Sequence, residues 1–145
     1  MYFVDREKIE SMLKYLEVQI HLFRGQKEWL TPLEKAALER LCQMMIESIL
    51  DVGNSMIDGF IMRDPGSYED IIDILVDEKV ISGPTGENLK VLILYRKNLV
   101  QDYLEIPHHD LQEQFSRYLH ELESFSTNVR DYLVNELGPV SAFKN

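Results

Sequence analysis

The sequence predicts an all-α protein, an antiparallel bundle of four long helices with one additional short helix. Apolar residues recur at intervals of three and four along every long stretch of the chain, and no run of alternating β-branched residues indicates a strand. Glycine and proline separate these stretches, as they do at helix ends. The 145 residues contain no repeat or low-complexity linker, so we expect a single helical domain spanning residues 1–145.

Local signals define where the first two helices begin. The first predicted helix starts after Asp5, which can act as its N-cap, and extends to about Gln26. The second starts at a strong signal in which Thr31 serves as the cap and Pro32 occupies the first helical position. Glu34 completes a capping box with the threonine, so this helix start is the best defined of the chain.

The second predicted helix extends to about Met62 and contains two glycines. Gly53 and Gly59 lie inside it, and glycines inside a helix indicate a bend or a close contact with a neighbouring helix. The turn signal Asp64-Pro65-Gly66 then breaks the helical pattern. We therefore expect a long second helix that ends shortly before this turn.

Three further helices are predicted in the second half of the chain. A short one, capped by its first serine, spans about residues 67–79. The fourth helix spans about residues 86–105, with Thr85 as its cap and Pro107 after its end. The fifth spans about residues 110–137 and is stopped by a glycine–proline pair. The elements together predict mostly antiparallel neighbours in a bundle.

Composition narrows the function classes. Hydrophobic residues make up 45% of the chain, which excludes a disordered protein. With 25 acidic and 15 basic side chains the formal net charge is −10, so indiscriminate nucleic-acid binding through a basic surface is not expected. Residues 84–106 contain three basic and three acidic side chains, and the net negative charge lies entirely outside them. This segment can therefore hold a local anion site.

The single cysteine and the N-terminal residues bear on the cellular compartment. Cys42 falls in an apolar helical pattern, so we expect a core thiol in a reducing environment. The start, residues 1–6, lacks the basic and apolar regions of a signal peptide, and the longest apolar run, residues 91–95, is too short to span a membrane. We therefore expect a cytoplasmic protein without membrane contact.

The most specific pattern of the chain is Tyr95-Arg96-Lys97-Asn98-Leu99-Val100-Gln101-Asp102-Tyr103. In this pattern an arginine is followed after four residues by a polar residue, and after one more residue by a tyrosine. The spacing resembles the signature of the HepT-like ribonuclease toxins of the HEPN superfamily, in which the polar residue is histidine. Here Gln101 holds that place. The resemblance covers about residues 33–106, through Leu38-Glu39-Arg40-Leu41, Ile46-Glu47-Ser48-Ile49-Leu50-Asp51 and Val80-Ile81-Ser82.

The resemblance implies an activity and partners. It implies a HEPN-type helical bundle and a homodimeric, metal-independent endoribonuclease without a cofactor, in which the motifs of two subunits meet across the dimer interface. It also implies a small nucleotidyltransferase antitoxin that can silence the toxin by transferring adenylyl groups to the tyrosine corresponding to Tyr103. The apolar faces of the second and fourth predicted helices likewise favour a dimer, because they exceed what a small bundle buries.

The motif residues differ in what chemistry they can perform. On a continuous helix Arg96 and Tyr103 lie on nearly the same face, whereas Gln101 lies roughly 140° from Arg96, a separation that a site built from two helix copies removes. Arg96 supplies a fixed charge and a planar fork for phosphate, and Asn98 is expected to hold the motif backbone or contact the second subunit. Gln101 cannot transfer a proton, and losing a general acid–base group costs about 10²- to 10⁴-fold in rate. Tyr103 is either a modification target or a buried interface residue.

Residues beside the motif offer substitutes for the missing histidine. His108 and His109 follow Pro107 and can turn toward the site, although exposed loop histidines are the simpler interpretation. Asp102 and Glu105 can accept protons, yet solvated helix carboxylates are more common than catalytic ones. Lys97, likewise, is either a phosphate contact or a plain surface charge. The residue pattern does not decide among them.

Two hypotheses from different classes remain. A metal-binding bundle needs Glu-x-x-His pairs on two helices, and the sequence does not contain two such pairs; with one cysteine it also lacks the spacing of a structural zinc site, so neither metal site is expected. The first hypothesis is an enzyme, a HepT-type ribonuclease toxin with a weakened Arg-x4-Gln-x-Tyr site. The second is an inactive interaction protein that dimerises and docks a nucleotidyltransferase partner. Arg96, Asn98 and Tyr103 favour the first, and Gln101 favours the second.

Overall fold

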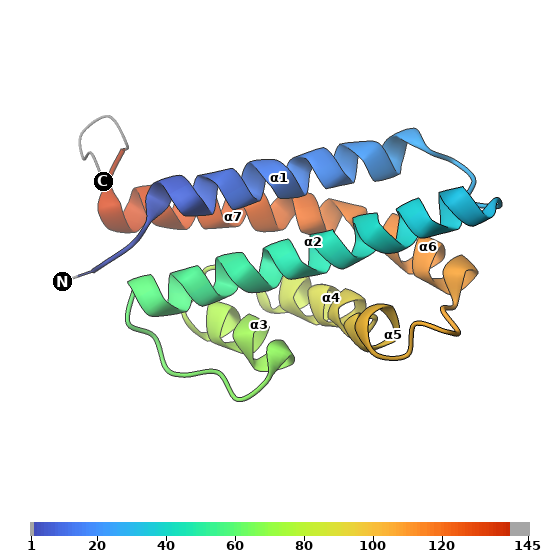
Figure 1. Ribbon diagram of the computed structural model, residues 1–145. Helices are drawn as coiled ribbons and strands as arrows, with labels where there is room; N and C mark the ends of the chain where they lie inside the picture. The colour runs from blue at the N-terminus through green and yellow to red at the C-terminus, as the bar shows by residue number, and fades with distance from the viewer. Residues whose placement is uncertain (1, 140–145) are drawn as a thin grey trace.

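The computed structural model describes residues 2–139, which form a bundle of helices (Figure 1). The helices are α1 (Arg6–Gly25), α2 (Pro32–Gly59), α3 (Tyr68–Asp77), α4 (Gly83–Ile93), α5 (Arg96–Val100), α6 (His108–Arg117) and α7 (Leu119–Leu137). No strand occurs in the described part of the chain, so the all-α prediction is confirmed. The predicted single domain of residues 1–145 extends outside the described residues at both ends.

Two layers of helices are visible in the bundle. Helices α1 and α7 lie antiparallel to each other, and α2 crosses beside them, with α3, α4 and α5 on its other side (Figure 1). Arg130 of α7 donates four hydrogen bonds of 2.7–3.0 Å to the carboxylates of Glu10 and Glu17 on α1. At the end of the bundle where α1 begins, Arg6 donates to the carbonyl oxygen of Gly138 at 2.8 Å, which ties the start of α1 to the end of α7.

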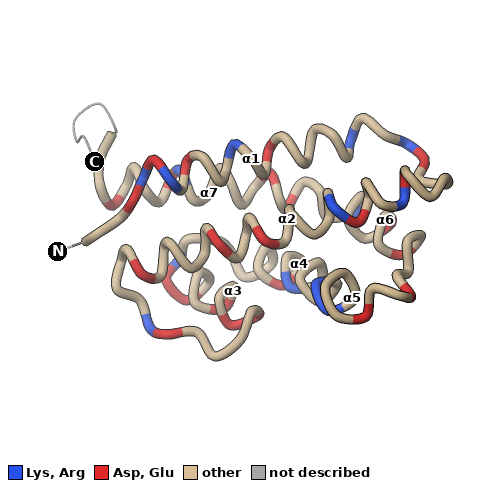
Figure 2. Tube along the Cα trace, viewed as in Figure 1, with Lys and Arg blue, Asp and Glu red and all other residues tan. Residues whose placement is uncertain are grey.

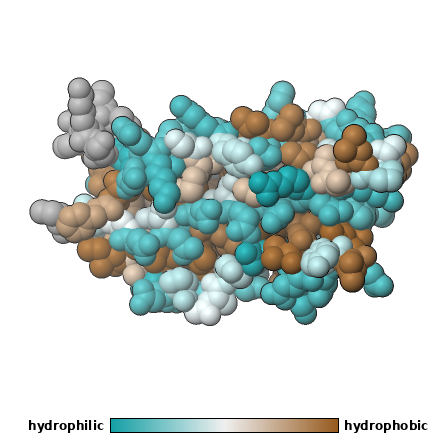
Figure 3. Space-filling model, in the orientation of Figure 1, coloured by the Kyte–Doolittle hydropathy of each residue, from teal (hydrophilic) through white to brown (hydrophobic). Residues whose placement is uncertain are grey.

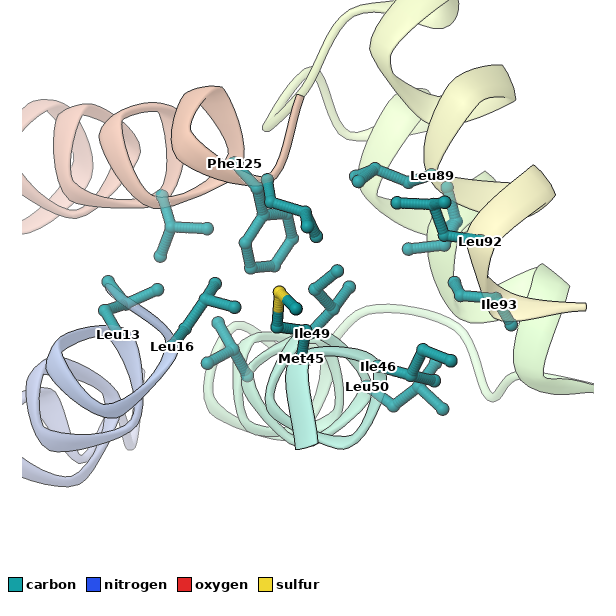
Figure 4. Close-up of a cluster of buried hydrophobic side chains, with 14 of the residues drawn as sticks. Leu13, Leu16, Met45, Ile46, Ile49, Leu50, Leu89, Leu92, Ile93 and Phe125 are labelled. Atoms are coloured by element: carbon teal, nitrogen blue, oxygen red, sulfur yellow. The ribbon is translucent and has the colours of Figure 1, made fainter. Parts of the chain in front are cut away.

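Helix α2 is the central element of the core. The close-up in Figure 4 shows Met45 and Ile49 of α2 near Leu13 and Leu16 of α1, and Ile46 and Leu50 on the side toward Leu92 and Ile93 of α4. Cys42 of the same helix is fully buried, as the sequence predicted, and burial raises the pKa of its thiol. Because α2 packs on both layers, side chains at the edge between its buried faces are held in fixed positions.

The predicted helix starts are confirmed at three places. Asp5 accepts a hydrogen bond from the Lys8 backbone N–H at 3.0 Å, and Ser67 accepts one from the Asp70 backbone N–H at 3.1 Å. Thr31 and the Glu34 side chain form the predicted reciprocal capping box, with distances of 3.1 and 2.9 Å. Local side-chain chemistry therefore sets where these helices begin.

The predicted close contact with a neighbouring helix is found at Gly53, whereas Gly59 contacts a segment that is not helical. A Cβ atom on Gly53 would lie 2.5 Å from Cγ2 of Ile71, so α3 approaches the α2 backbone at this point. A Cβ atom on Gly59 would lie 2.9 Å from Cγ2 of Val4, in the segment that precedes α1. Glycine at residue 53 thus sets how closely α3 packs against the central helix.

The fourth predicted helix, residues 86–105, differs from the structure in three respects. Its cap is Ser82 rather than Thr85, since Ser82 Oγ accepts from the Thr85 backbone N–H at 3.2 Å. The chain leaves the regular ladder at Tyr95, whose N–H donates to the carbonyl of Leu92 only three residues back. The second piece, α5, ends at Val100.

A tertiary contact accompanies this change of direction. The Tyr95 ring centre lies 6.4 Å from that of Phe115 in α6, and its hydroxyl donates a hydrogen bond to the Asp110 carboxylate of the same helix. Burial, with the Asp110 carboxylate as the second cause, raises the pKa of the Tyr95 hydroxyl. The periodicity of apolar residues along a helix does not report contacts with a later helix. The sequence therefore predicted one continuous helix here.

The fifth predicted helix, residues 110–137, is likewise divided. It begins earlier, at His108, and separates into α6 and α7 at Tyr118, where φ is −107° and ψ is 16°. Among the described helices, none is long and apolar enough to cross a membrane.

Candidate functional site

Arg96, the first residue of α5, is held by side chains from two other helices. Its Nε donates a hydrogen bond of 2.6 Å to Oε1 of Glu47 on α2. Its guanidinium carbon lies 4.3 Å from the centre of the Tyr68 ring, at the start of α3, in cation–π contact. The Arg96 side chain is 23% exposed and the Glu47 side chain 24%, so the pair lies at the surface without being fully solvated.

Most of the hydrogen-bonding capacity of Arg96 is unused. A guanidinium carries five N–H donors, and within residues 2–139 only the Nε–H of Arg96 makes a hydrogen bond. The two terminal nitrogens keep their donors, while the Glu47 and Tyr68 contacts restrict how the side chain can rotate. A positioned guanidinium with open donors matches the oxygens of a phosphate group.

A second carboxylate accompanies Glu47 on the same face of α2. Asp51 lies one helical turn further along, at the spacing that brings side chains about 5–6 Å apart. Burial raises the pKa of the Asp51 carboxyl, the charge of Glu47 raises it further, and Lys8 and Arg96 oppose this shift. Figure 2 shows the basic positions of α4 and α5 below the acidic positions along α2.

The other motif residues lie beside Arg96 in sequence but not on one helix with it. Gln101 is the C-cap of α5, and its backbone N–H donates to the Lys97 carbonyl at 2.9 Å. Tyr103 follows in a turn with 62% of its surface exposed, and Asn98 is half-buried within α5. In the described structure, the side chains of Gln101, Tyr103 and Asn98 make no hydrogen bond.

The expectation that Arg96 and Tyr103 share one face of a continuous helix is wrong. Helix α5 ends at Val100, three residues before Tyr103, so the two-turn spacing never forms. The roughly 140° separation inferred between Arg96 and Gln101 on an ideal helix also loses its basis, because Gln101 sits at the helix end. The loop after α5 determines where the glutamine and tyrosine point.

The proposed substitutes for the missing histidine make other contacts. His108 begins α6 rather than lying in a loop, and its Nε2 is 2.7 Å from Oε2 of Glu39 on α2. His109 is 3.5 Å from Glu113. Asp102 and Glu105, predicted on a helix, lie in the exposed link after α5, and Lys97 is exposed within α5. In the described part of the chain, none of these five side chains forms a hydrogen bond or an ion pair with Arg96.

Apolar side chains are exposed around the motif. Leu94 is 60% exposed, Val100 39%, Tyr103 62% and Leu104 89%. Figure 3 shows apolar surface over the region where Figure 1 draws α5 and the link that follows it. Several exposed apolar side chains gathered beside polar groups are typical of a protein contact site.

The two residues that contact Arg96, Glu47 and Tyr68, were missed by sequence reasoning. Glu47 and Asp51 stand four residues apart within the stretch of α2 that carried the family resemblance, and that spacing was the available signal. Tyr68 follows the Ser67 cap of α3, and no sequence spacing connects it with Arg96. Contacts between residues far apart in the chain require the fold.

Comparison with known proteins agrees with this picture. A family model described as Ribonuclease HepT-like matches residues 7–129. The chain is 54% identical over 144 residues to the Bacillus subtilis protein named "Putative RNase YutE", covering 99% of this chain and 100% of that protein. A solved structure of YutE, described as a cytosolic protein of unknown function, has a TM-score of 0.95 at 53% identity, covering 99% of this chain and 100% of that chain.

Two more distant structures share the fold. A toxin–antitoxin complex, MntA-HpeT, gives a TM-score of 0.76 at 17% identity over 85% of this chain and 98% of that chain. A tri-AMPylated HEPN toxin of Shewanella oneidensis in complex with the MNT antitoxin gives 0.72 at 20% identity over 86% and 95%. These likenesses show a HEPN-type helical fold. With a family match over residues 7–129 and a full-length relative at 54% identity, the chain belongs to the HepT-like family.

Proposed function

We propose that this protein is a metal-independent endoribonuclease with a weakened active site, and that it is the toxin of a toxin–antitoxin pair. The observation that carries the proposal is Arg96, which two helices hold in place while its terminal nitrogens keep open donors. An arginine in this state binds phosphate oxygens and stabilises the charge that builds up on phosphorus. Membership of the HepT-like family supports RNA as the phosphate-bearing substrate.

The weak element of the site is proton transfer. Cleavage by the 2′-hydroxyl group needs one group that accepts its proton and another that protonates the leaving 5′-oxygen. Gln101 can orient either oxygen by hydrogen bonding but cannot carry a proton between them. We therefore expect slow cleavage compared with a site that has histidine at this position.

We further propose a homodimer whose interface surrounds the motif. Leu94, Val100 and Leu104 are exposed beside Arg96, and burying them against a second copy would remove apolar surface from water. Gln101 and Asn98 of one subunit would then face the Arg96 of the other, and this composite arrangement does not need one helix to present all of them.

The partner we propose is a small nucleotidyltransferase, acting in the cytoplasm. Tyr103 is 62% exposed and its hydroxyl has no hydrogen-bond partner among the described residues, so it is accessible to an enzyme that transfers an adenylyl group. A HEPN relative of the same fold is described as tri-AMPylated and bound to the MNT antitoxin, and the relative YutE is described as cytosolic. Modification of Tyr103 would silence the site.

The test is cleavage of total RNA by the purified protein in excess EDTA, beside the variants Arg96→Ala and Gln101→His. We expect slow cleavage by the wild type, none above background by Arg96→Ala, and a rate about 10²- to 10⁴-fold higher for Gln101→His. Undiminished cleavage by Arg96→Ala would contradict the proposed site.

A second function is favoured by Gln101 together with the exposed apolar side chains of the motif. In that case the protein is an inactive dimer that docks a nucleotidyltransferase. An inert wild type with an active Gln101→His variant would support this reading, because it shows a binding scaffold that has lost only its acid–base group. Co-purification with a nucleotidyltransferase, reduced by Leu104→Asp, would then measure the docking surface.

A further inference from the structure

The central helix α2 holds a second residue of the motif region besides Arg96. His108, the first residue of α6, has its Nε2 atom 2.7 Å from Oε2 of Glu39. Glu39 precedes Glu47 on α2 by about two turns, which is about 12 Å along the helix axis. The two glutamates therefore hold the first residue of α5 and the first residue of α6, the two helices that lie next to α2 at this end of the bundle (Figure 1).

The segment between these two anchored residues is also joined at its base. We call residues 97–107 the motif segment, since they include Gln101 and Tyr103. The hydroxyl of Tyr95, just before Arg96, donates a hydrogen bond to the carboxylate of Asp110, just after His108. The two ends of the motif segment are thus tied both to each other and to α2.

The middle of the motif segment has few contacts of its own. Residues 101–105 are all exposed, and no side chain among them makes a hydrogen bond within the described part of the chain. Leu99 before them is buried, and Ile106 after them packs against the core. The positions of Gln101 and Tyr103 therefore depend on these two apolar side chains and on the polar contacts at the base of the segment.

The contact between Glu39 and His108 has the geometry of an anchor. An ionised carboxylate only accepts hydrogen bonds, so the Nε2 atom of His108 carries the hydrogen that points to Glu39. The His108 side chain is 25% exposed and the Glu39 side chain 35%, so water competes only in part for this hydrogen bond. Hydrogen bonds to charged groups are stronger than those between neutral groups. The ring nitrogen that faces α2 is thereby occupied.

We propose that Glu39 and His108 are positioning residues of the candidate site. Their hydrogen bond holds the end of the motif segment on α2 and so places Gln101 and Tyr103 relative to Arg96. The proposal deepens the ribonuclease function proposed above and rests on it. In this role His108 does not touch the RNA and acts through the segment that it anchors. When the anchor is lost, the segment adopts more conformations, and fewer of them place Gln101 beside the reacting oxygens.

The test compares variants of His108 that lose or keep the hydrogen bond. His108→Ala removes it, whereas His108→Gln keeps an N–H donor at nearly the same distance from the backbone but cannot transfer a proton. We expect RNA cleavage by His108→Ala to be slower by about 10- to 100-fold, and His108→Gln to keep most of the wild-type rate. His109→Ala is the matched control and should cleave like the wild type, because the His109 side chain is almost fully exposed.

Binding separates a positioning role from a contact with RNA. Arg96 keeps its contacts with Glu47 and Tyr68 in these variants, so His108→Ala should bind a 2′-O-methylated RNA oligonucleotide with the wild-type affinity. The loss then appears in kcat and not in KM. Glu39→Ala should reproduce it, and the double variant of Glu39 and His108 should be little slower than either single variant, because the two side chains act as one contact.

Hydrogen exchange follows the motif segment without requiring cleavage. The backbone N–H groups of Gln101 and Asp102 donate to the Lys97 carbonyl at 2.9 and 3.0 Å, at the end of α5. Both should exchange faster in His108→Ala than in the wild type and at the wild-type rate in His108→Gln. Exchange in α1 and α7 should not change, which would show that the bundle stays folded.

The outcomes distinguish the positioning role from the function on which it rests. Unchanged cleavage in His108→Ala would overturn the positioning role and leave the ribonuclease standing. An equal loss of cleavage in His108→Gln and His108→Ala would also overturn it, because it would assign proton transfer to the histidine. A wild type that cleaves no RNA would overturn the ribonuclease function. The exchange rates of Gln101 and Asp102 would then decide whether the hydrogen bond to Glu39 holds the motif segment, and unchanged rates in His108→Ala would contradict it.

Discussion

Two arginines of this protein, Arg130 and Arg96, are each paired with glutamate from a neighbouring helix, and they differ in how completely they are bound. Arg130 on α7 donates four hydrogen bonds to two carboxylates of α1. Arg96 on α5 donates one, to Glu47. The Arg130 guanidinium uses nearly all of its N–H donors and joins two helices. The Arg96 guanidinium is held in place, but the N–H groups of its two terminal nitrogens are not hydrogen-bonded within the described residues. The number of hydrogen bonds that each guanidinium makes therefore distinguishes a structural arginine from one that can bind a ligand.

We expect the largest effect from Arg96→Lys, which should slow RNA cleavage. Lysine keeps the charge but lacks the planar fork, so one charged hydrogen bond to phosphate is lost. We expect cleavage slower by about 10- to 100-fold, from roughly 1.5–3 kcal/mol per charged hydrogen bond. Arg130→Lys should cleave like the wild type, and equal losses in both variants would break the distinction.

Gly53 allows α3 to pack closely against α2, and Tyr68 at the start of α3 contacts Arg96. A Cβ atom there would meet Ile71 at 2.5 Å, so Gly53→Ala should push α3, with Tyr68 at its start, away from α2. We expect the free energy of unfolding to fall by about 1–3 kcal/mol, as in other overpacked contacts. Gly25→Ala, where no atom lies within 4 Å of the added Cβ, is the control and should change the free energy of unfolding by less than about 0.5 kcal/mol.

The saturated arginine should matter more for stability than for activity. Removing Arg130 by Arg130→Ala leaves Glu10 and Glu17 without their shared partner on a partly exposed surface. We expect urea denaturation to give a loss of about 1–2 kcal/mol in the free energy of unfolding, against less than about 1 kcal/mol for Arg96→Ala. The reverse order would show that Arg96 is the structural residue of the two.

The smallest predicted effect concerns the start of α5. Tyr95→Phe removes the hydroxyl that donates to Asp110 but keeps the ring near Phe115. The free energy of unfolding should fall by about 0.5–1.5 kcal/mol, the net value of one hydrogen bond. Tyr15→Phe, on the exposed face of α1, is the matched control and should have no measurable effect. An unchanged Tyr95→Phe would mean that packing alone directs the chain into α5.

Three of the helix starts could be predicted from sequence because their caps are local. Asp5, Thr31 and Ser67 each bind a backbone N–H three residues ahead, and that spacing is written in the chain. The breaks at Tyr95 and Tyr118 could not be predicted, because neither glycine nor proline marks them. At Tyr95 the visible cause is a contact with α6, which lies further along the chain.

In the candidate site, too, local features could be predicted from the sequence and contacts between distant residues could not. The motif identified Arg96 through its spacing to Gln101 and Tyr103, and the family assignment that followed from it is confirmed. Its partner Glu47 lies 49 residues earlier in the sequence, and only the packing of α5 on α2 brings them together. The predicted roles of Asn98, Gln101 and Tyr103 stay predictions, since the described structure gives these side chains no partner.

The most direct measurement of the central claim is binding of a 2′-O-methylated RNA oligonucleotide, which this chemistry cannot cleave, followed by fluorescence anisotropy. The wild type, Arg96→Ala and Arg130→Ala are compared at one low salt concentration, where phosphate contacts contribute most. If Arg96 binds phosphate through its free N–H donors, Arg96→Ala should bind the oligonucleotide at least about 10-fold more weakly, which corresponds to one charged hydrogen bond. Arg130→Ala should bind it like the wild type. Equal affinities for the wild type and Arg96→Ala would contradict the account.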